Sequence, residues 1–202
     1  MASDTYPAQR ERAELCDLFV EVGPDAPTLC GDWTTRDLAA HLVVRERRPD
    51  AAVGIVFSKA AGYLDKVQAG AADTDWTELI DTVRSGPPVW SPTRIAAVDK
   101  AANTIEFFVH HEDVRRAGDT WEPRELDADL NAALYAMLAK MAKRLVSSSP
   151  VGITFEPADG SDPVVAKDAE QSVTVRGEVG ELVLFAYGRQ DHSRVEIIGD
   201  DA

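Results

Sequence analysis

The spacing of the apolar residues changes once along the chain, near residues 147–150, and this change constrains the fold more than any other feature. Before it, apolar residues recur at helical spacing over almost the whole segment. After it, three short β-branched segments bounded by turn residues indicate strands. The sequence predicts an α+β protein with a helical domain over 1–147 and a small α/β domain over 148–202. The expected strands cover 151–157, 171–177 and 193–199, with a short helix over 178–188.

Local signals indicate where several of the helices begin and end. The first apolar stripe stops just before Gly23, a residue typical of helix ends. Thr34 and Asp37 have the spacing of a capping box, which opens a helix. Ser91 is expected to cap the longest helix, with Pro92 in its first position. The predicted helices after the first cover 34–48, 50–69, 75–85, 92–116 and 126–146.

Charge argues against nucleic-acid and anionic-membrane partners. The chain has 35 acidic and 21 basic residues, a formal charge of −14, and this field repels phosphate groups. The chain has no apolar run of membrane-spanning length and no signal-peptide pattern at its start, so a cytoplasmic protein is expected. Cys16 and Cys30 form no Cys-x-x-Cys pair, which excludes a zinc ribbon and predicts inert thiols in a reducing compartment.

A helical wheel over 92–117 predicts which polar side chains face inward. Glu106 and His110 lie on the shoulder of the apolar stripe, and Asp113 also points toward it. His111 points the opposite way, so it is expected at the surface. The stripe consists of Ile95, Val98, Ala102, Ile105 and Val109. Glu112, Arg115 and Arg116 are expected to form an exposed charged face.

Glu106 and His110 are separated by four positions, which places their side chains side by side on a helix, as two ligands of one ion require. His41, which lies between Leu38 and Leu42 at helical spacing, is the best third ligand. Two histidines and a glutamate on facing helices form a credible metal site. A hydrogen-bonded core histidine beside a surface Glu106/His110 pair is the alternative.

Three neighbouring residues have two interpretations each. Asp113 either orients a ligand histidine or pairs with Arg116. Arg45 either meets an anionic group of a substrate or is a solvated or ion-paired charge of its helix. Cys30 precedes the helix of His41, so it either approaches the site or is an inert thiol.

The chain resembles the DinB-like family of metal-binding four-helix bundles in two segments, TLCGDWTTRDLAAHLVVRERRP and FFVHHEDVRRAG. The resemblance is to the mycothiol-dependent maleylpyruvate isomerase branch, in which a small α/β domain follows the bundle. The C-terminal segments VTVRGEVGELVLFAYGR and VEIIGD are similar to that domain. By this resemblance His41, Glu106 and His110 match the metal ligands. It also implies a role for an arginine of the C-terminal domain, with Arg189 as the counterpart and Arg194 as its rival.

Two histidines and one carboxylate leave a coordination position open. An open divalent ion stabilises a bound thiol as thiolate, which then attacks an electrophilic carbon. This chemistry predicts an isomerase or S-transferase that uses a small thiol and an electrophilic substrate, and the resemblance implies that the thiol is mycothiol or similar to it. Zinc is the expected ion, with iron, nickel and manganese as other suitable ions. Water in the open position would instead give hydrolysis. The alternatives to an enzyme are a non-catalytic metal-containing ligand-binding or sensor module, and a carrier whose C-terminal domain binds an apolar ligand. A monomer or homodimer is expected.

Overall fold

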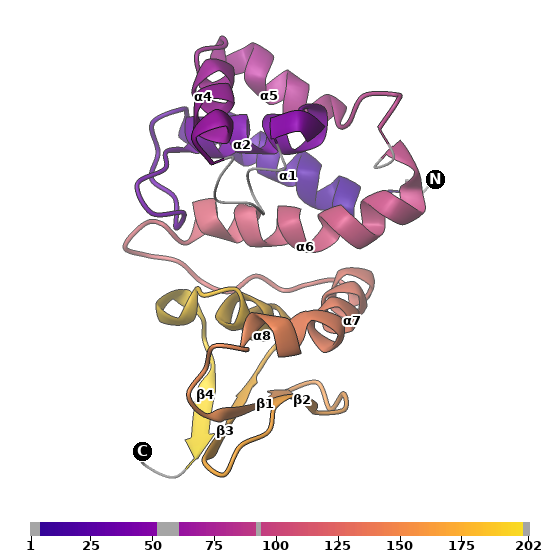
Figure 1. Ribbon diagram of the computed structural model, residues 1–202, viewed down its shortest axis with the longest axis vertical. Helices are drawn as coiled ribbons and strands as arrows, with labels where there is room; N and C mark the ends of the chain where they lie inside the picture. Colours follow the sequence, from indigo (N-terminus) through magenta and orange to yellow (C-terminus); the bar gives the residue numbers. More distant parts are fainter. Residues whose placement is uncertain (1–4, 52–60, 92–93, 200–202) are drawn as a thin grey trace. The chain divides into compact units, whose positions relative to one another are not determined.

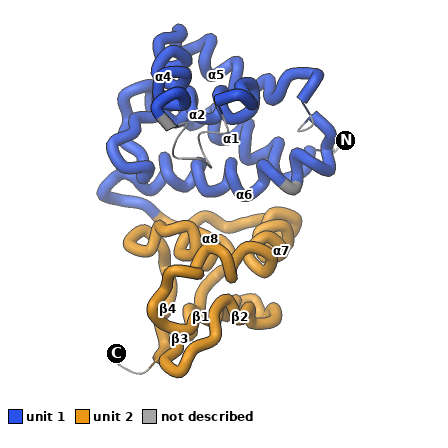
Figure 2. Tube along the Cα trace, in the orientation of Figure 1, with its two compact units in different colours: residues 1–121 blue, residues 122–202 orange. Residues whose placement is uncertain are grey.

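The computed structural model describes residues 5–51, 61–91 and 94–199. Its contacts divide the chain into two compact units, Met1–Trp121 and Glu122–Ala202 (Figure 2). Within the described residues, the first unit is helical and the second combines helices with a four-stranded sheet. The predicted α+β class is therefore confirmed.

The helices of the first unit share one apolar core. In this unit α1 packs on α5 and α6, and α2 packs on α4 and α5. Leu15 and Phe19 of α1, Leu38 of α2 and Phe107 of α6 are completely buried in that core. The described helices of this unit are α1 (Pro7–Val22), α2 (Thr35–Arg47), α4 (Ala61–Ala72), α5 (Trp76–Ser85) and α6 (Ala96–Arg115) (Figure 1).

The predicted helix ends are confirmed at two positions. Thr34 and Asp37 form a complete capping box at the start of α2. Gly23 follows α1 with a φ of 79°, a conformation that glycine adopts without steric cost, and its N–H donates to the carbonyl of Phe19. Part of the helix predicted over 50–69 and the predicted first position at Pro92 lie outside the described residues. The predicted cap at Ser91 was wrong, because α6 begins at Ala96 with Ile95 as its N-cap. The arrangement as a four-helix bundle stays a prediction, because residues 52–60, between α2 and α4, are not among the described residues.

The second unit has a mixed sheet in the order β2-β1-β3-β4. The central strands β1 and β3 are parallel, with Phe155 opposite Val175, and both outer strands are antiparallel to their neighbours. Helix α8 packs on β1 and β3, and α7 packs on α8 and β2. The elements are α7 (Ala128–Leu145), β1 (Gly152–Pro157), β2 (Val164–Lys167), β3 (Ser172–Gly177), α8 (Val179–Ala186) and β4 (Glu196–Gly199).

The second unit begins before α7, at Glu122, whereas the sequence predicts a boundary at 147–148. The difference arises because α7 buries Leu130, Leu134 and Leu138 in a unit where it packs on α8 and β2. The change from helix to strand after α7 is therefore a change of secondary structure inside one unit. No helix of the described segments is long and apolar enough to cross a membrane.

Candidate metal centre

Helices α2 and α6 bring the three predicted ligands together. Oε1 of Glu106 lies 3.6 Å from Nε2 of His41 and 3.4 Å from Nε2 of His110. One potential ligand atom from each residue lies within 4.8 Å of those of the other two. Zinc–ligand distances of about 2.0–2.2 Å place the ligands of a tetrahedral ion about 3.2–3.6 Å apart, so these side chains can hold one ion with small adjustments.

Packing fixes the two imidazoles. Leu38 and Leu42 anchor α2 in the core on either side of His41, and the indole of Trp33 lies against the His41 ring at a centroid distance of 5.2 Å. The rings of His41 and His110 meet edge to face, 5.5 Å apart. Their Nε2 atoms both lie near Oε1 of Glu106.

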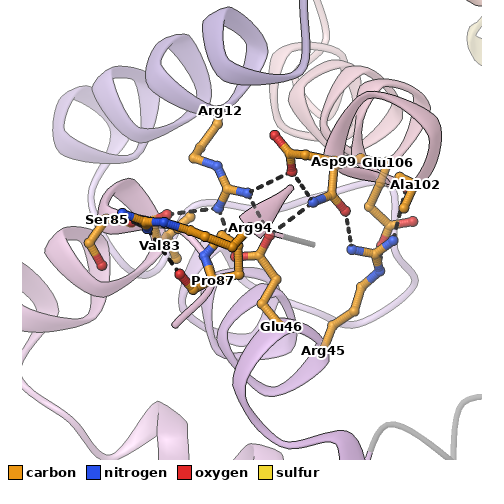
Figure 3. A network of polar contacts seen from close by, with 12 residues as sticks. Arg12, Arg45, Glu46, Val83, Ser85, Pro87, Arg94, Asp99, Ala102 and Glu106 are labelled. Carbon is orange, nitrogen blue, oxygen red and sulfur yellow. Dashed lines mark hydrogen bonds and ion pairs between the residues drawn. The ribbon is translucent and has the colours of Figure 1, made fainter. Parts of the chain in front are cut away.

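Arg45 supplies a positive charge beside the carboxylate (Figure 3). Its Nε lies 3.1 Å from Oε1 of Glu106, and its guanidinium also donates to Asn103 and to the carbonyl of Ala102. Burial opposes ionisation of Glu106, but hydrogen bonds from His110 and His41 and the charge of Arg45 together lower its pKa well below the usual value. Glu106 is thus ionised at neutral pH. Arg45 forms its ion pair with this predicted ligand on α6, so a role for Arg45 toward an anionic substrate stays a prediction.

Asp113 orients His110 from the opposite side of the ring. The imidazole Nδ1 lies 2.9 Å from Oδ2 of the completely buried Asp113, which leaves Nε2 directed at Glu106. Burial disfavours the charged imidazole, but hydrogen bonds with Asp113, Cys30 and Glu106 raise the pKa of His110 well above its usual value. A carboxylate on the far nitrogen is the usual support of a metal-ligating histidine. The ligand-orienting interpretation of Asp113 fits this geometry.

Cys30 also approaches the site. Its thiol donates to Oδ2 of Asp113 over 3.0 Å and lies 3.7 Å from Nδ1 of His110. The preceding loop is tied to α6, because the N–H of Leu29 donates to the carbonyl of Asp113. The other cysteine differs: burial raises the pKa of Cys16 to about 12, which agrees with the expected inert thiol.

The prediction for the back of α6 was wrong. His111 is only 6% exposed and its Nδ1 lies 3.1 Å from Oε2 of Glu11 on α1, so it is not a surface residue. Glu112 and Arg116 are also buried and bond each other. The predicted apolar stripe is exposed at its start, at Ile95 and Val98. The helical wheel assumed one buried face, and this assumption fails because no side chain from residue 103 to 116 is exposed.

A buried polar network next to the site was not predicted. Arg12 of α1 forms a two-pronged ion pair with Glu46 of α2, and Asn103 links Glu46 and Asp99. The sequence did contain a signal. Arg12 shares its helix face with Leu15, and Glu46 shares its face with Leu42, so opposite charges occupy two inward faces.

Arg189 and Arg194 belong to the second unit. The guanidinium of Arg189 donates to the carbonyl of Tyr187, and the N–H of Arg194 donates to Glu181. A role for either arginine at the metal-ligand group stays a prediction.

No protein-family profile matches the chain, and no curated protein matches it. Among solved structures, the chain is similar to the crystal structure of a mycothiol-dependent maleylpyruvate isomerase, with a TM-score of 0.66 and 14% identity over 96% of this chain and 92% of that one. A histidine-to-alanine mutant of a mycothiol-dependent maleylpyruvate isomerase matches with a TM-score of 0.55 and 13% identity, over 94% and 90% of the two chains. At this identity the likeness establishes a shared fold.

Proposed function

We propose that the protein is a metal-dependent enzyme that uses a small thiol, as an S-transferase or isomerase, with a divalent ion held by His41, Glu106 and His110. The observation that carries the proposal is the convergence of these three side chains from two helices, with Asp113 behind His110. The fold shared with a mycothiol-dependent isomerase supports a thiol of the mycothiol type as cofactor. Zinc suits this set of ligands.

Each side chain has a distinct part in this proposal. A bound divalent ion would supply the positive charge that keeps a thiol ionised at neutral pH. Glu106 provides a permanent negative charge because its carboxyl stays ionised, and Asp113 holds Nδ1 of His110 so that Nε2 faces the ion. In an isomerase the thiol adds to a double bond of the substrate and leaves again after rotation, whereas in a transferase the new carbon–sulfur bond is kept and a leaving group departs.

Thiol binding tests the proposal directly. Cobalt(II) is loaded in place of the native metal, and a panel of small thiols that includes mycothiol is added. A sulfur-to-cobalt charge-transfer band is expected in the near ultraviolet. The variant Cys30→Ser is the control, because a band that survives in it comes from the added thiol and not from Cys30. If no thiol gives a band and no thiol-dependent turnover of electrophiles occurs, the proposed function is wrong.

Turnover and thermal-melting measurements with the same thiols separate an enzyme from a non-catalytic binding module. In an enzyme, saturable turnover of an electrophile with the bound thiol is lost in Glu106→Ala while circular dichroism stays unchanged. In a binding module, ligands raise the melting temperature and the substrate is recovered intact.

We predict that metal binding releases a proton from His110. Its raised pKa keeps the imidazole charged in the metal-free protein at neutral pH, and only the neutral ring can bind a metal ion. Zinc affinity is therefore expected to rise by up to tenfold per pH unit between about pH 6 and 8. Calorimetry in two buffers of different ionisation enthalpy measures the released proton. Equal observed binding enthalpies in the two buffers would show that no proton is released, which would contradict the assignment of His110.

Asp113→Asn is expected to lower zinc affinity by roughly 10–100-fold, because it removes the negative charge at Oδ2, the atom that both Nδ1 of His110 and the Cys30 thiol contact. Cys30→Ser keeps the carboxylate and provides the matched control, with a much smaller expected loss. Competition with a chromophoric chelator gives both affinities. Equal losses in the two variants would show that Asp113 has no special role in orienting the histidine.

A further inference from the structure

A cavity of about 330 Å³ lies in the first unit, beside the start of α1. Residues from α1, from the turn after α5 and from the beginning of α6 line it, among them Tyr6, Gln9, Arg84 and Arg94. His41, Glu106 and His110 are not among its lining residues, so it is distinct from the candidate metal centre. Its volume lies within the range of about 300–1,000 Å³ that is typical of small-molecule sites.

The charge of the cavity wall is opposite to that of the chain. Three arginines and a single aspartate line the cavity, although the chain as a whole has 35 acidic and 21 basic residues. The aspartate, Asp99, is already engaged: one carboxylate oxygen accepts the hydroxyl of Tyr6 at 2.6 Å, and the other accepts the amide of Asn103. Both carboxylate oxygens of Asp99 are therefore engaged, and the lining residues include more arginines than carboxylates.

The three arginines differ in how their charges are balanced. Arg12 is paired with Glu46, and Arg84 is paired with Asp17 at 2.8 Å. Arg94 is exposed, and its guanidinium donates to two backbone carbonyls, those of Ser85 and Pro87 (Figure 3). Within the described part of the chain, no carboxylate forms an ion pair with Arg94. It is therefore the cation that can receive an anion without losing an existing ion pair.

The wall behind Arg94 is held in place by buried contacts (Figure 3). Arg12 donates to Glu46 and to the carbonyl of Val83, and its guanidinium lies 4.1 Å above the ring of Phe107. Asn103 joins Glu46 and Asp99 in the same network. Binding to a wall that is already ordered costs little reorganisation.

We propose that this cavity is a binding site for a small oxyanion, a carboxylate or phosphate group, with Arg94 as its principal ligand. The planar guanidinium matches two oxygens of either group through parallel hydrogen bonds. The hydrogen bonds from Arg94 to Ser85 and Pro87 both come from one terminal nitrogen, so the N–H groups of Nε and of the other terminal nitrogen can donate to an anion. Gln9, in the same wall, adds a side-chain amide as a neutral donor.

Calorimetry on the chelator-treated full-length protein tests the site, because removal of metal excludes anion binding to a metal ion. Inorganic phosphate and benzoate are the two probes, and the one that saturates identifies the group that the cavity accepts. The matched control is Arg36→Gln, since Arg36 also donates to two backbone carbonyls, of Ala72 and Thr74, but does not line the cavity.

Wild type and Arg36→Gln are expected to bind at least one probe with equal affinity. Arg94→Gln is expected to bind it at least tenfold more weakly, and Arg94→Lys, which keeps the charge without the fork, should fall between them. Circular dichroism checks that each variant is folded. Saturable binding that is unchanged in Arg94→Gln, or no binding of either probe to the wild type, would overturn the proposal.

Discussion

Arg12→Met is expected to lower the free energy of unfolding by about 3–5 kcal/mol, the range typical when one partner of a buried ion pair is removed. Both side chains of the Arg12–Glu46 pair are at most 7% exposed. Without Arg12, the carboxylate of Glu46 stays buried with only the amide of Asn103 as a strong donor among its described contacts. Chemical denaturation monitored by circular dichroism measures the loss.

The double variant Arg12→Met with Glu46→Leu is the informative control. It removes both charges and leaves apolar side chains at positions next to the core, so much of the lost stability should return. If the double variant is as unstable as the sum of the two single variants, Arg12 and Glu46 do not act as a pair. If Arg12→Met alone costs less than about 1 kcal/mol, the buried ion pair contributes no more than an exposed one.

Glu106→Gln is expected to lower zinc affinity by more than about 100-fold, which exceeds the loss typical of changing a group behind a ligand. The amide has nearly the shape of the carboxylate, but it is neutral and only one of its two terminal atoms can bind a metal. The charge of Arg45, whose Nε lies 3.1 Å from Oε1, would then be close to the ion without compensation. Competition with a chelator measures the change.

Glu78→Gln serves as the matched control for this substitution. Glu78 is exposed in the first turn of α5 and is not in the group of potential ligands, so the Glu78→Gln variant should bind zinc with wild-type affinity. Wild-type zinc affinity in Glu106→Gln would show that the carboxylate is not a ligand and that it only forms hydrogen bonds or ion pairs with His41 and His110.

Capping and turn preferences correctly predicted features that depend on neighbouring residues in the chain. The capping box at Thr34 and the glycine after α1 depend on neighbours within a few positions, and both are present in the structure. The inward direction of His41 and His110 was predictable from buried apolar residues of each histidine's own helix, whereas their meeting across α2 and α6 was inferred from the choice of a third ligand and from the family resemblance. Strand β2 was missed because it is an edge strand of four residues and its Val165 is exposed, so it lacks a buried apolar alternation.

Contacts between distant segments were the part that could not be predicted. The assignment of His111 to the surface assumed that α6 has one buried face, yet the pairing of His111 with Glu11 requires knowing that α6 packs on α1. The same holds for α7, whose apolar residues fit a helical domain as well as a sheet-containing unit. A wheel identifies which residues of a helix are alike, but not which neighbour covers them.

Metal content tests the central claim most directly. The protein is purified without a histidine tag or chelators, and mass spectrometry compares the wild type with His41→Ala and Glu106→Ala after circular dichroism confirms that both variants are folded. The account predicts close to one divalent ion per wild-type chain and its loss in both variants, which would join α2 and α6 in one site. A wild type that holds no metal even after reconstitution, or variants that keep it, would contradict the assignment of His41, Glu106 and His110.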